Sequence, residues 1–146
     1  MTVTEPTSER TLILVKPDGV QRGLCGEVLR RVEAKGYTMV AVRLLIPNRD
    51  LLAQHYAEHV GKGFYESLVG FMSSGPVLAV VAEGVRVVEG FRSLAGATDP
   101  TAAAPGTIRG DLARDWGNGP QENVVHGSDS PASAAREIAL WFPELA

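Results

Sequence analysis

Uninterrupted apolar runs along the chain mark two strands that we expect to be buried on both faces. Residues 11–15 form one run and residues 76–82 form the other. Residues 37–45 instead alternate between apolar and polar side chains, which is typical of a strand with one buried face. A further strand is predicted over the β-branched residues that precede His126.

Apolar side chains with helical spacing predict the helices. One such stripe predicts a helix over residues 24–35 that stops at Gly36. Ser130 is a preferred N-cap and Pro131 a preferred first-turn residue, so they predict the start of a helix that ends at Trp141. Further helices are expected over residues 50–59, within residues 61–75 and over residues 85–94.

Two segments have no apolar periodicity. Residues 1–9 are expected to form a loose arm. Residues 95–110 read as a long loop, and a structureless loop of this length in a compact domain is more often functional or interfacial than a simple connection.

This order of elements predicts an α/β protein of the α+β type. Strand, helix, strand, helices, strand, helix, loop, strand and helix resemble the βαββαβ order of a ferredoxin-like fold, a four-stranded antiparallel sheet with helices on one face. A doubly wound parallel sheet is the alternative. The tight corner at Gly36 does not decide between the two.

Composition limits the classes of protein to which the chain can belong. Its 146 residues suit a single domain over residues 1–146. The apolar content of 45%, the charged content of 21% and the net charge of −3 are typical of a folded protein and argue against a general nucleic-acid coat, which would be basic. Any anionic ligand must therefore be held by a local cluster of cations.

The chain shows no sign of a membrane segment or of a disulfide framework. No apolar run approaches the roughly 18 residues of a membrane helix, and residues 1–10 are too polar for a signal peptide, so the cytoplasm is the expected compartment. The single cysteine, Cys25, cannot form an internal disulfide, so packing must hold the fold together, with the help of any subunit contacts.

The segment around His126 is the first candidate for chemistry. His126 precedes Gly127, so its ring is expected at a strand end with open space beside it. A neutral imidazole is populated at pH 7 and can act as a nucleophile without a separate base. Ser128 and Asp129 could turn back to hydrogen-bond to the ring or the backbone. Glu137, about two turns into the final helix, could reach Ser128 or the ring. A histidine in a turn without a chemical role is the alternative.

Three cationic side chains follow the ends of predicted elements. Lys16, Arg92 and Arg109 lie far apart in the sequence, and each alone is typical of a surface charge. If they converge near one imidazole, they would stabilise the charge of a phosphoryl group during transfer. The glycine-rich phosphate loops of other nucleotide-binding folds are absent from the sequence.

His55 and His59 lie four residues apart, which could place both on one helix face as zinc ligands. The sequence offers no evident third ligand and lacks the His-Glu-x-x-His order. We therefore expect these two histidines on a solvated helix face.

Several longer motifs carry a resemblance to a known family. They are Lys16-Pro-Asp-Gly, Arg22-Gly-Leu, Gly75-Pro-Val, Gly96-Ala-Thr-Asp-Pro, Ala104-Pro-Gly-Thr-Ile-Arg-Gly-Asp and Asn123-Val-Val-His-Gly-Ser-Asp-Ser. Together they make the chain similar to nucleoside diphosphate kinases from Thr11 to Pro143. The resemblance implies transfer of the γ-phosphoryl group of a nucleoside triphosphate to histidine and then to a nucleoside diphosphate, with Mg²⁺ held mainly by the nucleotide phosphates rather than by side chains.

The resemblance also implies a role for each matching residue. His126 would be the phosphorylated residue, supported by Ser128 and Glu137. Phe64 would stack on the base with Leu68 packed nearby, an arrangement that tolerates every common base. The phosphates would be held by Lys16, Tyr56, Arg92, Thr98 and Arg109, and the ribose by Lys16 and Asn123.

The resemblance further implies subunit assembly and shows two departures from the family pattern. The loop around Pro100 is similar to the family's loop between subunits, so a homohexamer is expected, with a tetramer second. Asp99 stands where asparagine is more usual. The segment between Arg109 and Asn123 is several residues longer than usual, and its Trp116 would either border the base or pack on the protein.

Other functions compete with the kinase reading. A non-catalytic nucleic-acid-binding protein would need a basic face, against which the net charge of −3 argues. A histidine phosphatase would need an acid for the leaving group, and Asp129 is the candidate for that acid. Arg109, Gly110 and Asp111 spell an adhesion tripeptide, to which we give little weight in a chain without a signal peptide.

Overall fold

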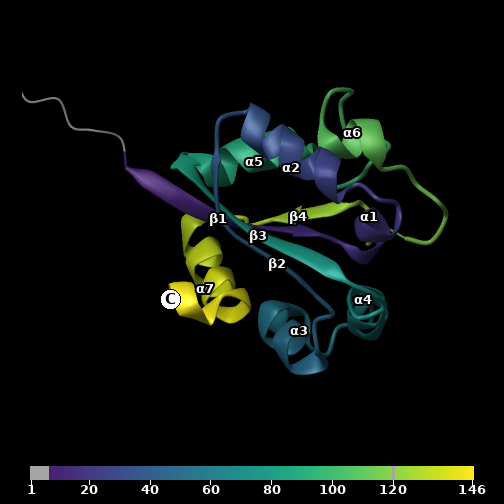
Figure 1. The fold of residues 1–146 in the computed structure, drawn as a ribbon. Helices are drawn as coiled ribbons and strands as arrows, with labels where there is room; N and C mark the ends of the chain where they lie inside the picture. The colour runs from purple at the N-terminus through teal and green to yellow at the C-terminus, as the bar shows by residue number, and fades with distance from the viewer. Residues whose placement is uncertain (1–6, 120) are drawn as a thin grey trace, which may run out of the picture.

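The computed structural model describes residues 7–119 and 121–146. Its centre is a four-stranded antiparallel sheet with the strand order β2-β3-β1-β4 (Figure 1). The strands are β1 (Ser8–Val15), β2 (Thr38–Leu45), β3 (Val77–Val85) and β4 (Val125–Gly127). The predicted antiparallel sheet with ferredoxin-like connections is confirmed, and the parallel alternative is wrong.

The two central strands are those marked by apolar runs. β1 pairs with β3 from Ser8 opposite Val85 to Val15 opposite Leu78. The pairing begins within the segment expected to be a loose arm, so that expectation is wrong for Ser8 and Glu9. Residues 1–6 of the expected arm lie outside the described residues.

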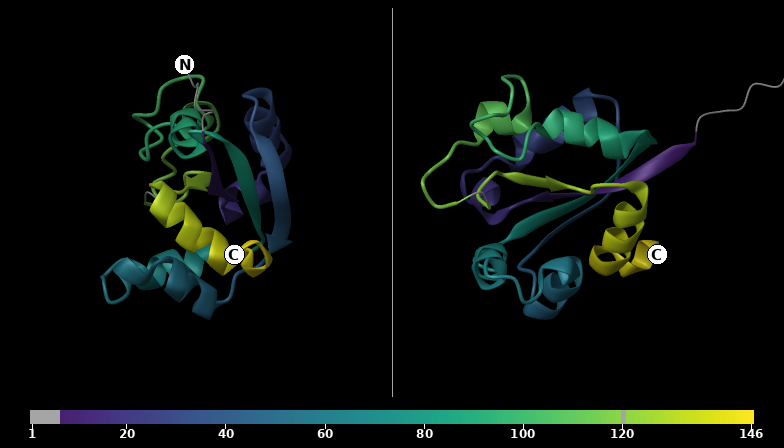
Figure 2. Two further views of the ribbon diagram at one scale, coloured as in Figure 1. Left: turned by 90° about the vertical axis from the view of Figure 1, so that its left-hand side faces the viewer. Right: turned by 180° about the vertical axis from the view of Figure 1, so that it is seen from behind.

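Helices cover both faces of the sheet (Figures 1 and 2). The prediction of helices on one face is therefore wrong. The reason lies in β1, because successive side chains of a strand point to opposite faces. Ile13 and Val15 belong to one apolar cluster, and Leu12 and Leu14 belong to another. Both faces therefore need an apolar cover.

The two covers are built from different parts of the chain. α2 (Cys25–Ala34), α5 (Val87–Ala95) and α6 (Ile108–Leu112) cover one face. α3 (Arg49–His55), α4 (Tyr65–Met72) and α7 (Pro131–Trp141) cover the other. The predicted start of α7 is confirmed, since the Ser130 side chain accepts a hydrogen bond from the backbone N–H of Ser133.

Several elements differ from the prediction. A short helix, α1 (Pro17–Gln21), follows β1 directly, and α6 begins within the loop expected over residues 95–110. The helix expected over residues 50–59 ends at His55, and a 3₁₀ turn, η1 (Ala57–His59), follows. A second 3₁₀ turn, η2 (Pro143–Leu145), closes the chain.

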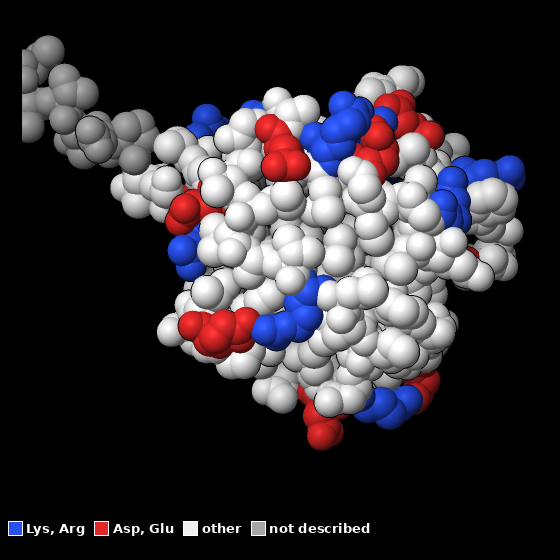
Figure 3. Space-filling view, in the orientation of Figure 1, with Lys and Arg blue, Asp and Glu red and all other residues white. Residues whose placement is uncertain are grey.

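The surface in Figure 3 shows basic side chains next to acidic ones rather than in a stripe. Ion pairs such as Arg43–Glu144 and Arg31–Asp111 account for part of this mixture. Within the described part of the chain, no helix is both long and apolar enough to cross a membrane.

Candidate active site

A cleft of about 530 Å³ opens along β4, where β1 ends beside the start of β4 and α5 gives way to the following loop. Its lining includes six of the residues singled out in the sequence, namely Lys16, Arg92, Thr98, Arg109, Asn123 and His126. These residues come from positions more than a hundred residues apart, so the antiparallel sheet brings them together. The cleft thus meets the condition set by the sequence, that the three cations lie near one imidazole.

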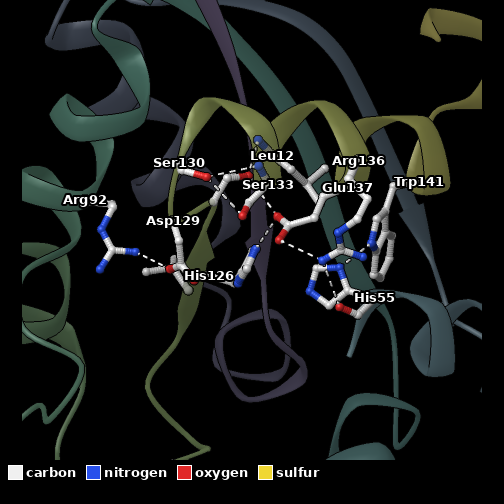
Figure 4. Close-up of polar contacts among 12 residues, drawn as sticks. Leu12, His55, Arg92, His126, Asp129, Ser130, Ser133, Arg136, Glu137 and Trp141 are labelled. Atoms are coloured by element: carbon white, nitrogen blue, oxygen red, sulfur yellow. Dashed lines mark hydrogen bonds and ion pairs between the residues drawn. The ribbon is translucent and has the colours of Figure 1, made fainter. Parts of the chain in front are cut away.

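His126 lies in β4 opposite Leu14 of β1, and its ring is held from one side (Figure 4). Its Nε2 lies 3.0 Å from Oε1 of Glu137, and the hydroxyl of Ser128 donates to the same oxygen at 2.8 Å. A carboxylate only accepts, so this contact places the ring proton on Nε2. The lone pair of Nδ1 is then the nucleophilic one.

Glu137 stays ionised although its side chain is only 7% exposed. Burial raises the pKa of this carboxyl, but the hydrogen bond and the charge of His126 outweigh it, so the pKa lies below its ordinary value. The carboxylate can therefore stabilise positive charge on the ring of His126. The predicted contacts of Glu137 with Ser128 and with the ring are both present.

The open space expected beside the ring of His126 is the cleft itself, whereas the space next to the Gly127 backbone is filled. A Cβ atom on Gly127 would lie 2.6 Å from the ring of Phe91. The absence of a side chain therefore lets α5 pack closely against β4, and this helix carries Arg92 to the cleft.

Lys16 is nearly buried, with 9% exposure, and is aimed by two acceptors. Its Nζ donates to Oδ1 of Asn123 at 2.8 Å and to the backbone oxygen of Gln121 at 3.3 Å. Burial, together with the charge of Arg109, lowers the pKa of Lys16 to about 8. Lys16 is thus still mostly protonated at pH 7, and an anion bound beside it would stabilise its charged form.

Arg109 is anchored to backbone oxygens on both sides of the cleft. Its guanidinium donates to Gly96 at 3.0 Å and to Val125 at 2.7 Å. Burial and the nearby charge of Arg92 lower the pKa of Arg109 to about 10, so it remains a cation at pH 7. Arg92 itself is exposed and forms an ion pair with Asp129.

Five predicted site residues lie outside the lining of this cleft. They are Ser128 and Glu137, described above, and Tyr56, Phe64 and Leu68. Tyr56 follows α3, and its ring packs edge-on to that of His55 at 4.6 Å. Phe64 precedes α4 and is 46% exposed, whereas Leu68 within α4 is 8% exposed and belongs to the core. Nearly half of Phe64 is therefore accessible to a ligand, and its ring also lies 5.1 Å from that of His59.

The expectation of a solvated face for His55 and His59 is wrong. His55 is 4% exposed, and its Nδ1 accepts a hydrogen bond from the indole N–H of Trp141 at 3.0 Å. The chain turns after His55, so His59 lies in η1 and not on the same helix face. The sequence signal was present, because His55 follows Leu52 by three positions and so shares its buried side.

His55 also extends the group around the nucleophile. Its ring lies 4.9 Å from that of His126, and burial followed by the charge of His126 lowers its pKa to about 3. Donor atoms of His55, His126 and Glu137 all lie within 4.8 Å of one another. The existing hydrogen bonds already use ring nitrogens and a carboxylate oxygen of these residues, so a metal ion would have to replace them.

The family model described as "Nucleoside diphosphate kinase" matches residues 9–146. The chain belongs to the nucleoside diphosphate kinase family. A nucleoside diphosphate kinase of Mycobacterium avium is 59% identical over 138 residues, which cover 94% of this chain and 98% of that protein. One of Saccharopolyspora erythraea is 60% identical over 139 residues, which cover 94% and 99%.

Solved structures agree with this assignment to the nucleoside diphosphate kinase family. A family protein from Babesia bovis matches with a TM-score of 0.88 and 49% identity, covering 93% of this chain and 90% of that one. The enzyme of Halobacterium salinarum in complex with CDP matches with a TM-score of 0.86 and 48% identity, covering 93% and 88%. The resemblance inferred from the motifs is confirmed, and the chain is a nucleotide-dependent phosphotransferase.

The buried, neutral His55 predicts how the stability of this nucleoside diphosphate kinase depends on pH. Its pKa is about 3 in the folded chain, while an unfolded chain binds the proton near pH 6.5. Between these two pH values the unfolded chain binds a proton that the folded chain does not, so acid favours unfolding. The contribution of neutral His55 to stability is complete above pH 6.5 and is lost as the pH falls towards 3. Between pH 7 and pH 5 the wild type should lose about 2 kcal/mol more free energy of unfolding than His55→Asn, which keeps an acceptor for Trp141.

Urea unfolding of both proteins at the two pH values measures this difference. His59→Asn is the control, because His59 is only partly buried, and it should keep the pH dependence of the wild type. Parallel pH profiles for the wild type and His55→Asn would show that the neutral ring does not carry the effect.

Proposed function

We propose that His126 carries a phosphoryl group from a nucleoside triphosphate to a nucleoside diphosphate in a ping-pong reaction. The observation that carries this proposal is the position of the His126 ring. The ring is hydrogen-bonded through Nε2 to Glu137 and lines a cleft with Lys16, Arg92 and Arg109. Membership of the nucleoside diphosphate kinase family supports it.

The first half-reaction forms one bond and breaks another. Nδ1 of His126 attacks the γ-phosphorus, the bond from that phosphorus to the β-γ bridging oxygen breaks, and the diphosphate leaves with the electron pair. No proton needs to be removed from Nδ1, since the ring proton is on Nε2. The ring becomes cationic, and Glu137 stabilises that charge at 3.0 Å. The second half-reaction reverses these steps with another diphosphate.

The phosphates are held by cations and hydroxyls from different elements. We assign to Lys16, Arg92 and Arg109 the stabilisation of the negative charge on the phosphoryl group during its transfer. Thr98 lines the same cleft and is assigned a supporting contact, as is the hydroxyl of Tyr56, whose pKa is raised by burial and by the charge of Glu137 so that it remains a neutral donor.

The ribose and base extend from the phosphates towards α4. Lys16 and Asn123 are bonded to each other at 2.8 Å and are assigned to the ribose hydroxyls. The exposed ring of Phe64 is assigned to base stacking, with Leu68 beneath it. Stacking does not depend on base identity, which supports broad specificity. The CDP complex of the Halobacterium salinarum enzyme shows that a relative of this fold binds a pyrimidine diphosphate.

Mg²⁺ is the cofactor that we propose. Among the described residues that line the cleft, Asp129 is the carboxylate, and it is paired with Arg92. Hard divalent cations prefer oxygen ligands, so this cation-rich cleft fits Mg²⁺ held by nucleotide phosphates rather than by a set of side chains. When bound, the ion neutralises phosphate charge.

We also propose a homohexamer, with a tetramer second, and one domain over residues 1–146. The edge strand β2 supports assembly, because Val42, Leu44 and Ile46 on or beside it are between 48% and 62% exposed. Large exposed apolar patches are typical of interfaces. The cytoplasmic location stays a prediction.

His126→Gln should abolish phosphorylation from γ-labelled ATP and Mg²⁺ together with nucleotide-dependent transfer, because the nucleophile is gone. The wild-type label should be acid-labile and base-stable, and initial rates with two substrates should give parallel double-reciprocal lines. His59→Gln is the matched control and should still be labelled. A label that persists in His126→Gln, or intersecting lines, would contradict the proposal.

Pro100→Ser should lower the thermal midpoint and make it depend on protein concentration, because the loop around Pro100 is proposed as a subunit contact. Phosphoenzyme formation should remain. Melting curves across a range of concentrations, with sedimentation to give the mass, test this point. A wild-type chain that sediments as a monomer would contradict the proposed subunit contact.

Trp116→Ala should affect stability rather than base selection. Trp116 is 48% exposed, and its ring is covered by the guanidiniums of Arg114 at 4.4 Å and Arg22 at 5.7 Å, so it packs on its own chain. Loss of these contacts should cost roughly 1 kcal/mol and leave the Michaelis constants of purine and pyrimidine diphosphates in their wild-type ratio. Trp116→Phe, which keeps a flat ring, is the control. Unequal changes of the Michaelis constants among the bases would place Trp116 beside the base instead. Pro120 of the same turn lies outside the described residues.

A further inference from the structure

The residue before β4 has an unusual backbone conformation. Val124 has a φ of 72°, and the N–H of Val125 donates to the oxygen of Asn123 at 2.8 Å, which closes a three-residue turn around it. A turn of this kind with a positive φ is rare, and the left-handed region is particularly unfavourable for a β-branched residue. Its side chain is also fully buried. Such a conformation persists only where the surroundings hold it.

The turn has a geometric consequence for the cleft. In an extended strand, residues three apart point to opposite faces. Asn123 and His126 are three apart, yet both line the same cleft. The reversal at Val124 therefore lets the residue that bonds Lys16 and the nucleophile face one nucleotide.

Both polar backbone atoms of Val124 are held by the segment after β1. The N–H of Val124 donates to Oδ2 of Asp18 at 3.0 Å, and the oxygen of Val124 accepts from the N–H of Lys16 at 2.8 Å. From the other side, Arg109 donates to the oxygens of Asn123 at 3.3 Å and of Val125 at 2.7 Å.

Asp18 has an environment that stability alone does not explain. It is 9% exposed, and Oδ1 has no hydrogen-bond partner among the described residues. Burial raises the pKa of its carboxyl, which shows that the site disfavours the charge. A buried acid with one unsatisfied oxygen is costly, so its bond to the turn needs a reason beyond folding.

Gly19 brings Asp18 close enough to make this bond. A Cβ atom on Gly19 would lie 2.8 Å from the side chain of Val15 and 3.1 Å from the backbone oxygen of Val124. Helix α1 thus rests directly on the turn, and a side chain at position 19 would push it away.

We propose that Asp18 is a positioning residue for phosphoryl transfer, because its carboxylate holds the strained turn at Val124 that directs Asn123 and His126 into one cleft. This inference rests on the proposed reaction at His126. Asp18 itself lies outside the cleft lining and acts through the backbone of the turn.

Single-turnover labelling of His126 over a range of ATP concentrations tests the proposal, since it separates the limiting rate from the half-saturating concentration. Asp18→Ala should lower the limiting rate roughly 10- to 100-fold, because small displacements of reacting groups cost rates of that order. Asp18→Asn should recover most of the rate, because its carbonyl oxygen can accept from Val124. Both variants remove the same charge near Lys16, so the difference between them reports the hydrogen bond.

Three further variants sharpen the test. Gly19→Ala keeps the carboxylate but displaces α1, so it should also slow labelling. Val124→Gly removes the strain, and in this background Asp18→Ala should have a smaller effect on the limiting rate. Asp111→Ala is the matched control, because it deletes another carboxylate that accepts a backbone N–H, that of Gly106 at 2.8 Å, away from the cleft, and its limiting rate should be that of the wild type.

Circular dichroism confirms that each variant is folded before its rate is measured. A folded Asp18→Ala protein with the wild-type limiting rate would overturn the proposal, as would equal impairment of Asp18→Ala and Asp18→Asn. If Asp18→Ala does not fold, a wild-type rate in Gly19→Ala would overturn it. A wild type that is not labelled at His126 would instead refute the proposed reaction.

Discussion

A carboxylate that is removed from water must be paired, and Glu137 is paired with the ring of His126. The same oxygen accepts from Ser128, whose hydroxyl accepts in turn from the backbone N–H of Leu12 at 3.2 Å. This chain of bonds ties α7 to both β4 and β1. The contact that orients the ring of His126 is therefore also a contact between secondary-structure layers, and removing the ring would take a hydrogen bond from a buried carboxylate.

Lys16 and Arg109 are cations whose charged forms are disfavoured in the cleft and would be stabilised by a bound anion. Lys16 is nearly buried beside Arg109, and both have lowered pKa values because burial and like charge disfavour their charged forms. Their carbonyl and amide acceptors keep them aimed into the cleft all the same. Preorganised charge of this kind is unfavourable for folding and favourable for phosphate binding, as is common at active sites.

Much of the site could be anticipated from local sequence. The N-cap at Ser130, the apolar run before Lys16 and the spacing from His126 to Glu137 were each sufficient to predict a neighbouring element or contact, because these signals act within a few residues. The buried position of His55 was missed, although its spacing from Leu52 pointed inward. The close packing of the Phe91 ring on Gly127 was also not foreseen, because Phe91 lies in a helix more than thirty residues earlier in the sequence.

The sequence by itself indicated the four strands and the longer helices, favoured the antiparallel βαββαβ order and, through its motifs, pointed to the family and to the proposed nucleophile. The tertiary structure alone decided that helices cover both faces, that α3 ends at His55 and that Asp18 reaches the backbone of Val124. The physical reason is the range of the interactions. Periodicity and capping are encoded between neighbours, whereas a buried carboxylate on a strained turn depends on two segments more than a hundred residues apart that meet only when the sheet has formed.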